Sequence, residues 1–144
     1  MKIKVYKTTE ISDKEWREFV DEFNKTFNRN STVKSKKIFY TSNIFRYSYH
    51  AFAVSDKNRV VGHTSLIPAL YKFNGDKVLA GISGGTFVSE EFRSDVLLFK
   101  KMYESLKDFA SQEGMVATLG VPNNNSFKYS LKILGKKYIG DLNY

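Results

Sequence analysis

The sequence feature that most constrains the fold is the pair Asn74-Gly75, which lies between two runs of strand-forming residues. These runs extend from Ala69 to Phe73 and from Lys77 to Val88. Asn-Gly is a preferred pair for a two-residue hairpin turn, because both central positions of that turn need a positive φ. The sequence therefore predicts a β-hairpin, and any fold for this chain must contain a sheet with this antiparallel pair.

Three further strands are predicted before the hairpin. Lys2 to Tyr6 alternates lysines with Ile3 and Val5, which is the period of a strand with one buried face. His50 to Ser55 and Arg59 to Pro68 are rich in strand formers and are separated by the turn-forming residues 56–58. The middle of the chain is therefore predicted to be a meander of three or four strands.

A helix is predicted between the first strand and this meander. Ser12 and Glu15 have the spacing of a capping box, and Ile11 is placed to contact Trp16 as a hydrophobic staple. The apolar residues that recur at helical spacing are Trp16, Phe19, Val20, Phe23 and Phe27. A face of this kind is typical of core packing.

Helices and strands alternate in the second half of the chain. The predicted elements are a long amphipathic helix at Val96 to Glu113, a short buried strand at Met115 to Leu119, a short helix at Ser126 to Leu134 and a strand at Lys137 to Ile139. Gly114 and Gly135 are placed to end the two helices. The order from Lys77 onward requires at least one β-α-β unit.

Two segments stand out from these regular patterns. Glycine and serine fall inside the last meander strand, which predicts a bulge or a close approach of a ligand to the backbone; the residues are Gly81, Ser83, Gly84 and Gly85. Asn28 to Tyr49 has no clean period and is predicted to be a loop or a short helix. Its aromatic residues either line an acceptor cleft or cover the core, and both alternatives stay open; they are Tyr40, Phe45, Tyr47 and Tyr49.

The predicted fold class follows from this order of elements. A single domain over residues 1–144 is expected to have a central mixed, mostly antiparallel sheet flanked by helices, which is an α/β fold of the α+β kind. The length of 144 residues is sufficient for one core without disulfides or metal ions.

Composition excludes several classes of protein and site. The absence of cysteine excludes disulfides, a thiolate nucleophile and cysteine-type zinc sites, and it is consistent with the reducing cytoplasm. No apolar run approaches the roughly 20 residues of a membrane span, and no signal-type segment follows Met1, so we expect a cytoplasmic protein. The net charge of +8 favours polyanionic partners, but the charge is scattered and no nucleic-acid-reading motif is present.

Two stretches of the sequence resemble a known family. Residues 81–93, GISGGTFVSEEFR, are followed by a long helix, and residues 120–126, GVPNNNS, open a short helix that ends in Leu134-Gly135 before a predicted strand. Both stretches and the order of elements resemble the GNAT (Gcn5-related) N-acetyltransferases over nearly the whole chain. The resemblance implies an acetyl-CoA-dependent enzyme that transfers an acyl group to a primary amine by direct attack on the thioester. It implies a small-molecule amine acceptor, for which an amino sugar is one candidate.

The resemblance also implies a cofactor site. Its residues would be Phe87, Val88, Arg93, Ser94, Asp95, Val96, Leu97, Asn125 and Ser126. The unpaired N–H groups at the start of the long helix would hold the pyrophosphate. In the family this turn carries Gln or Arg and two small residues, usually glycine, whereas the matching positions here are Glu91, Ser94 and Val96. Arg93 is retained and could pair with a phosphate.

Three residues are candidates for catalysis. Glu90, at the end of the central strand, and His63, on a preceding strand, are candidates for the base that accepts the proton of the amine. Many family members carry a tyrosine as proton donor to the thiolate where this chain has Leu131, and Tyr129 lies close by. The altered turn and Leu131 also favour an alternative function, a catalytically inactive binding or regulatory domain.

The last four residues, 141–144, fall where the family continues with closing strands. Either another copy completes the sheet, as a homodimer formed by strand exchange, or the chain is the front part of a longer protein.

Overall fold

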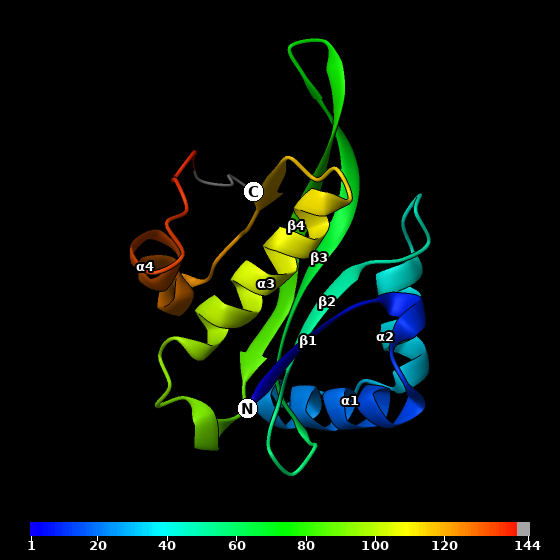
Figure 1. The fold of residues 1–144 in the computed structure, drawn as a ribbon, viewed down its shortest axis with the longest axis vertical. Coiled ribbons are helices and arrows are strands. Elements are labelled where there is room, and N and C mark those ends of the chain that lie inside the picture. Colours follow the sequence, from blue (N-terminus) through cyan, green and yellow to red (C-terminus); the bar gives the residue numbers. More distant parts are fainter. Residues whose placement is uncertain (141–144) are drawn as a thin grey trace.

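The computed structural model describes residues 1–140, with the side chain of Asn125 excepted. Its centre is a five-stranded sheet in the order β1-β2-β3-β4-β5 (Figure 1). The strands are β1 (Lys2–Lys7), β2 (Tyr49–Val54), β3 (Val60–Phe73), β4 (Asp76–Val88) and β5 (Ala117–Leu119). The first four strands pair antiparallel, and β5 lies parallel to β4. The predicted fold class and the β-α-β unit are therefore confirmed.

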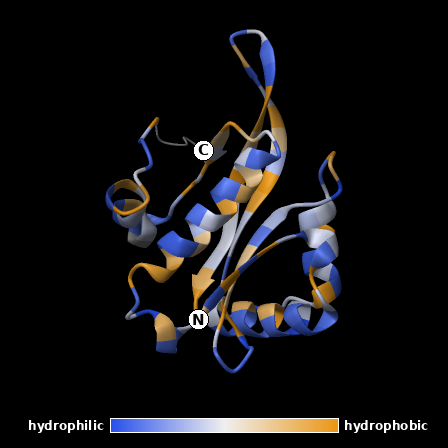
Figure 2. Ribbon diagram, viewed as in Figure 1, coloured by the Kyte–Doolittle hydropathy of each residue, from blue (hydrophilic) through white to orange (hydrophobic). Residues whose placement is uncertain are grey.

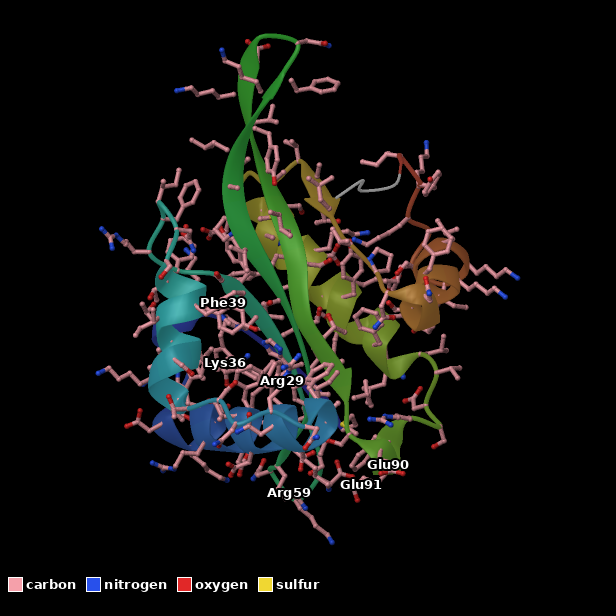
Figure 3. All side chains as sticks on the ribbon, turned by 180° about the vertical axis from the view of Figure 1, so that it is seen from behind. Arg29, Lys36, Phe39, Arg59, Glu90 and Glu91 are labelled. Atoms are coloured by element: carbon pink, nitrogen blue, oxygen red, sulfur yellow. The ribbon has the colours of Figure 1, made fainter. Side chains whose placement is uncertain are left out.

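Helices cover both faces of the sheet. They are α1 (Asp13–Phe27), α2 (Val33–Thr41), α3 (Leu98–Gln112) and α4 (Asn124–Lys132), with short 3-10 helices at Thr8–Glu10 and Glu90–Phe92. Figure 1 views the sheet from the side of α3, and Figure 3 views it from the side of α1 and α2. No helix within residues 1–140 is long and apolar enough to cross a membrane.

The alternation of side chains along the strands divides the core into two clusters. On β2, Ala51 and Ala53 pack with Leu98, Met102 and other residues of α3, whereas Phe52 and Val54 pack with α1. Successive residues of a strand point to opposite faces of the sheet, so β2, which is buried throughout, contributes to both clusters. Figure 2 shows the matching alternation of hydrophobic and hydrophilic residues along α1 and α3.

The local signals at the start of α1 and at the hairpin are confirmed. Ser12 and Glu15 form the capping box, and the helix begins at Asp13, directly after Ser12. Asn74 and Gly75 have φ values of 50° and 86°, as the predicted turn requires. Each signal acts within four residues of sequence.

The structure corrects the division of the meander. Arg59 to Pro68 and Ala69 to Phe73 were predicted as separate strands, but they form the single strand β3. A proline inside a strand removes one backbone donor. It is tolerated here because β2 pairs with β3 only as far as Leu66, so Pro68 faces no strand on that side.

Two predicted boundaries and one predicted strand in the second half are also corrected. The helix α3 begins at Leu98 rather than Val96, because Val96 is 65% exposed and gains little burial from joining it. Asn123 caps α4 by accepting a hydrogen bond from the Ser126 amide at 2.9 Å, so that helix begins two residues early. The strand predicted at Lys137 to Ile139 does not form in the described chain, where Ile139 is 85% exposed and would bury little.

Candidate functional site

The main cleft of the described chain opens where β4 and β5 separate. Their pairing ends at Ile82 and Leu119, and the Ser83 hydroxyl donates the last bridging hydrogen bond to the Leu119 carbonyl at 3.0 Å. From Ser83 to Val88 the edge of β4 has no β5 partner within residues 1–140. The cleft that results has a volume of about 760 Å³. An unpaired strand edge of this length can pair with an extended, amide-containing ligand.

The cleft is walled by elements from the whole length of the chain. The residues that line it are Phe23, Phe27 and Arg29 from α1 and its end, Ser83 to Val88 from β4, Phe99 and Tyr103 from α3, and Gly120 to Asn123, Ser126, Tyr129, Ser130, Leu134 and Lys136 from the segment around α4. The lining is largely apolar and aromatic, with a few polar groups, which is typical of a small-molecule site.

A β-bulge shapes the β4 wall of the cleft. The register of β3 and β4 shifts between His63 and Ser65, and Gly85 has a φ of 60°. A Cβ atom at this glycine would also collide with the Tyr40 hydroxyl, so only glycine fits. The Ser65 hydroxyl donates to the Gly84 carbonyl at 2.7 Å. The bulge predicted from the glycines is therefore confirmed.

A chain of buried hydrogen bonds holds the bulge. Nδ1 of His63 lies 2.7 Å from the Gly85 carbonyl, and its Nε2 lies 3.0 Å from Nδ1 of His50. Because a carbonyl only accepts, His63 Nδ1 must donate. When both rings are neutral, His50 Nδ1 donates to His63, and His50 Nε2 accepts at 3.0 Å from the Thr8 hydroxyl, whose proton then points to His50 and not to the Ser48 carbonyl at 3.1 Å. Both rings are neutral in this arrangement, and His63 is not part of the cleft lining.

Burial explains why these two histidines are neutral. Burial lowers the pKa of His63, the hydrogen bond to the Gly85 carbonyl opposes this effect, and the Lys36 charge adds to it, so that the resulting pKa is about 3. Burial and the neighbouring His63 lower the pKa of His50 well below its ordinary value. An imidazole with such a pKa is uncharged at neutral pH, keeps its single N–H and accepts a second proton poorly. The structure therefore places His63 as a support for Gly85, behind the cleft wall.

The other two candidate catalytic residues lie in different places. Glu90 is exposed in its 3-10 helix beyond the end of β4, and it does not line the cleft; Figure 3 shows it beside Glu91. Tyr129 does line the cleft. Its ring stacks on Phe99 with 5.4 Å between centroids, and its hydroxyl donates to the Val96 carbonyl at 2.6 Å. Burial raises the pKa of this tyrosine, so its hydroxyl stays protonated.

The residues predicted to bind the cofactor divide into two groups. Phe87, Val88 and Ser126 line the cleft, whereas the loop 93–97 is exposed and lies outside the lining. The side chain of Asn125 lies outside the described part of the structure. The candidate residues that the structure brings together are thus those of β4 and α4.

Interactions inside the loop 93–97 occupy the start of α3. The Arg93 Nε donates to the Val88 carbonyl at 3.0 Å. The Asp95 carboxylate accepts from the Leu97 amide at 3.1 Å and pairs with Lys101 at 3.9 Å. A carboxylate at a helix N-terminus satisfies the donors that would otherwise hold an anion. Asp95 therefore competes with a phosphate for this position.

Sequence reasoning missed the charged residues of the cleft. Arg29 and Lys136 line it, and neither belongs to a motif. Figure 3 shows Arg29 near Lys36, which lies over the Phe23 ring with its Nζ 3.3 Å from the centroid. Arg29 and Lys136 are far apart in the sequence, and only the fold brings them to one cleft. In the sequence, the pair Lys136-Lys137 indicated nothing beyond surface charge. Residues 1–140 contain no cluster of His, Asp and Glu that could hold a metal ion.

No protein-family model matches the sequence, and a search of curated proteins finds no significant sequence match. Solved structures with a similar fold do exist. An acetyltransferase from Trypanosoma brucei has a TM-score of 0.75 at 12% identity, covering 99% of this chain and 98% of that one. Glucosamine-6-phosphate N-acetyltransferase from Arabidopsis thaliana has a TM-score of 0.71 at 18% identity, covering 100% and 99%.

A third similar structure is AAC(6')-Iy in complex with a bisubstrate analogue, CoA-S-monomethyl-acetylneamine. Its TM-score is 0.74 at 12% identity, and the match covers 100% of this chain and 97% of that one. The similarity extends over the sheet and its helices in all three cases. The chain therefore has the GNAT acetyltransferase fold that its sequence resembles.

Proposed function

We propose that the protein is an N-acetyltransferase that transfers the acyl group of acetyl-CoA to a primary amine of a small molecule. The observation that carries the proposal is the cleft between β4 and β5, with its unpaired β4 edge from Ser83 to Val88. An extended chain with amide groups, such as the pantetheine arm of CoA, can pair with that edge. The likeness to solved acetyltransferases supports the same reading.

The residues at the cleft fit this reaction in the following way. The thioester supplied by acetyl-CoA would lie beside the bulge at Gly84 and Gly85, because a Cβ atom at Gly84 would meet nothing within 4 Å and the space there is open. Phe87 and Val88 would flank the arm. The Ser126 hydroxyl at the start of α4, which donates to the Asn123 side chain at 2.9 Å in the structure, would turn from that partner to donate to the arm. The reaction needs no covalent enzyme intermediate, so the protein mainly positions the amine and the thioester.

Tyr129 is the proposed proton donor to the departing thiolate. It lines the cleft and keeps its proton at neutral pH. In the structure its hydroxyl is bonded to the Val96 carbonyl, and it must leave this partner to reach a ligand. No side chain of the described lining is proposed as the general base, because the two candidates, Glu90 and His63, both lie outside that lining. The amine would then lose its proton to water.

The test is calorimetric titration with acetyl-CoA and with free CoA, followed by assay of released thiol with a panel of amines. We expect micromolar binding by the wild type, weakened in the Arg93→Ala variant if the guanidinium pairs with a phosphate. Arg17→Ala, an exposed arginine on α1, is the matched control and should bind normally. A folded protein that binds neither compound would rule out the proposal.

One observation favours a second function, a binding or regulatory domain without catalysis. Asp95 occupies the start of α3, and Val96 is engaged by Tyr129, so the loop is fixed without any phosphate. If CoA does not bind, a binding or regulatory role without catalysis becomes the favoured function. A homodimer through strand exchange stays a prediction, and light scattering at high protein concentration tests it.

A further inference from the structure

The ammonium group of Lys136 has an unusual environment. Its Nζ is buried and has no hydrogen-bond partner, and the residue lines the cleft. It lies over the Tyr103 ring, 4.8 Å from the centroid. No salt bridge of Lys136 is found within residues 1–140. The contact with the ring offsets part of the cost of burial, but a buried cation without a charged or carbonyl partner is strongly unfavourable.

The ammonium lies at the narrow end of the cleft, which is the end where β4 and β5 begin to separate. A Cβ atom on Gly120 would lie 3.4 Å from the Lys136 Nζ and 2.8 Å from the Ser83 hydroxyl. The ammonium therefore lies beside the point where β4 and β5 separate. The Gly120 position leaves this space open, because any larger residue would fill it.

The other charge in the lining has the same sign. Arg29 is the only other charged residue among the described residues that line the cleft, and no Asp or Glu is among them. Lys36, which packs on the cleft residue Phe23, has its pKa lowered by burial and by the charge of Arg29. Arg29 and Lys36 are neighbouring cations, and the described lining has no carboxylate to separate them. They repel each other, so an anion at this wall would be stabilised.

We propose that Lys136 binds a negatively charged oxygen of the ligand at the narrow end of the cleft. The class of ligand is therefore an anion that carries a phosphate or a carboxylate. A polycationic amine acceptor, which needs acidic residues, does not fit this lining. The identity of the ligand rests on the proposed function, and the charged oxygen belongs either to acetyl-CoA or to an acceptor such as an amino-sugar phosphate. The acceptor fits better, because the phosphates of CoA are expected at the start of α3.

The variants are Lys136→Met, which keeps the length of the side chain without its charge, and Lys137→Met as a matched control. Lys137 is adjacent and exposed and does not line the cleft. The probes are CoA, glucosamine and glucosamine 6-phosphate, each titrated into wild type and variants by calorimetry. The two sugars differ only in the phosphate, so their difference isolates the anion. The amino-sugar titrations contain no CoA, and they test Lys136 even if the proposed acetyltransferase function fails.

We expect wild type to prefer glucosamine 6-phosphate to glucosamine and Lys136→Met to lose about tenfold to a hundredfold of its affinity for the phosphate ester. If Lys136→Met leaves the binding of CoA unchanged, the charged oxygen belongs to the acceptor. If the binding of CoA falls by this factor instead, the charged oxygen belongs to the cofactor. Lys136→Met should also be at least as thermostable as wild type without ligand, because it removes an unpaired buried charge. If Lys136→Met binds both CoA and the phosphate ester as wild type does, or unfolds at a clearly lower temperature, the proposal is wrong.

Discussion

The buried pair His50 and His63 should make the protein lose stability in mild acid. An ordinary histidine has a pKa of 6.5, whereas that of His63 in the folded protein is about 3. Between these values the unfolded chain binds a proton that the folded chain does not, so acid favours unfolding. The stability is fully present above pH 6.5 and falls continuously as the pH decreases toward 3. His50, whose pKa is lowered in the same direction, adds to the effect.

The magnitude follows from this difference in pKa. At pH 5 the unfolded state gains about 2 kcal/mol from protonation of His63, compared with almost nothing at pH 7.5. The slope below pH 6 approaches about 1.4 kcal/mol per pH unit for this residue. A typical domain has only about 5–15 kcal/mol of stability, so the loss is a large fraction of the total. Lys36, the nearby charge that acts on His63, stays protonated over this range and leaves the sign unchanged.

The measurement is urea unfolding between pH 7.5 and pH 5, followed by the fluorescence of Trp16. This is the single tryptophan, it is buried, and its ring lies 6.0 Å from that of His50. The variant His63→Gln cannot titrate and breaks buried hydrogen bonds. It should be less stable by about 1–3 kcal/mol at pH 7.5 but lose about 2 kcal/mol less than wild type on acidification.

The carboxylate of Glu15 does not interfere in this window. Burial alone would raise the pKa of Glu15, but hydrogen bonds from Ser12, Tyr6 and Lys4 outweigh it and bring the pKa to about 2. The stability that Glu15 contributes is present above its ordinary pKa of 4.5 and is lost only below it. Equal stability of wild type at pH 7.5 and pH 5, or an undiminished slope in His63→Gln, would refute the reasoning.

Three further predictions concern the cleft. Gly85→Ala should cost at least about 1–2 kcal/mol in unfolding free energy because of its positive φ, whereas Gly84→Ala, whose Cβ would meet nothing, should be nearly neutral; equal losses in urea titrations would contradict the bulge argument. Tyr129→Phe should lower kcat about a hundredfold with CoA affinity within a few-fold of wild type, measured by steady-state kinetics and calorimetry, and an unchanged kcat would remove it as the acid. Asp95→Asn should raise the affinity for CoA a few-fold by removing the competing charge, and weaker binding would show that the carboxylate helps to shape the loop.

The parts of the fold that could be predicted depend on short-range interactions. The capping box at Ser12 and Glu15 acts within one helical turn, and the Asn74-Gly75 turn needs only two positive φ values. The strand at Lys137 to Ile139 was predicted from local pattern too, but a strand also needs a partner at its edge. The error at Pro68 has the same origin, because only the extent of β2 decides whether the missing donor matters.

The cleft could be predicted only in part. The glycines of β4 indicated a bulge, and resemblance indicated Phe87, Val88 and Ser126, all of which line the cleft. Arg29 and Lys136 lie near opposite ends of the sequence and have no motif, so the pattern of residues could not place them together. Their common sign becomes informative only once the fold shows that no described acidic residue shares the lining.

The case of His63 shows why a residue type alone does not establish a catalytic role. Its ordinary pKa was the reason to consider it as a base, and burial removes that reason. The chain has two histidines and no cysteine, and both histidines are buried and neutral. No other side chain has an unperturbed pKa between 5 and 8. The rate of any transfer reaction should therefore show no enzyme side-chain ionisation near pH 6.5. The pH–rate profile should be measured with an amine whose own pKa lies well above 8. A change of rate around pH 6.5 that occurs in wild type and is absent in His63→Gln would instead show that His63 reaches the reacting atoms.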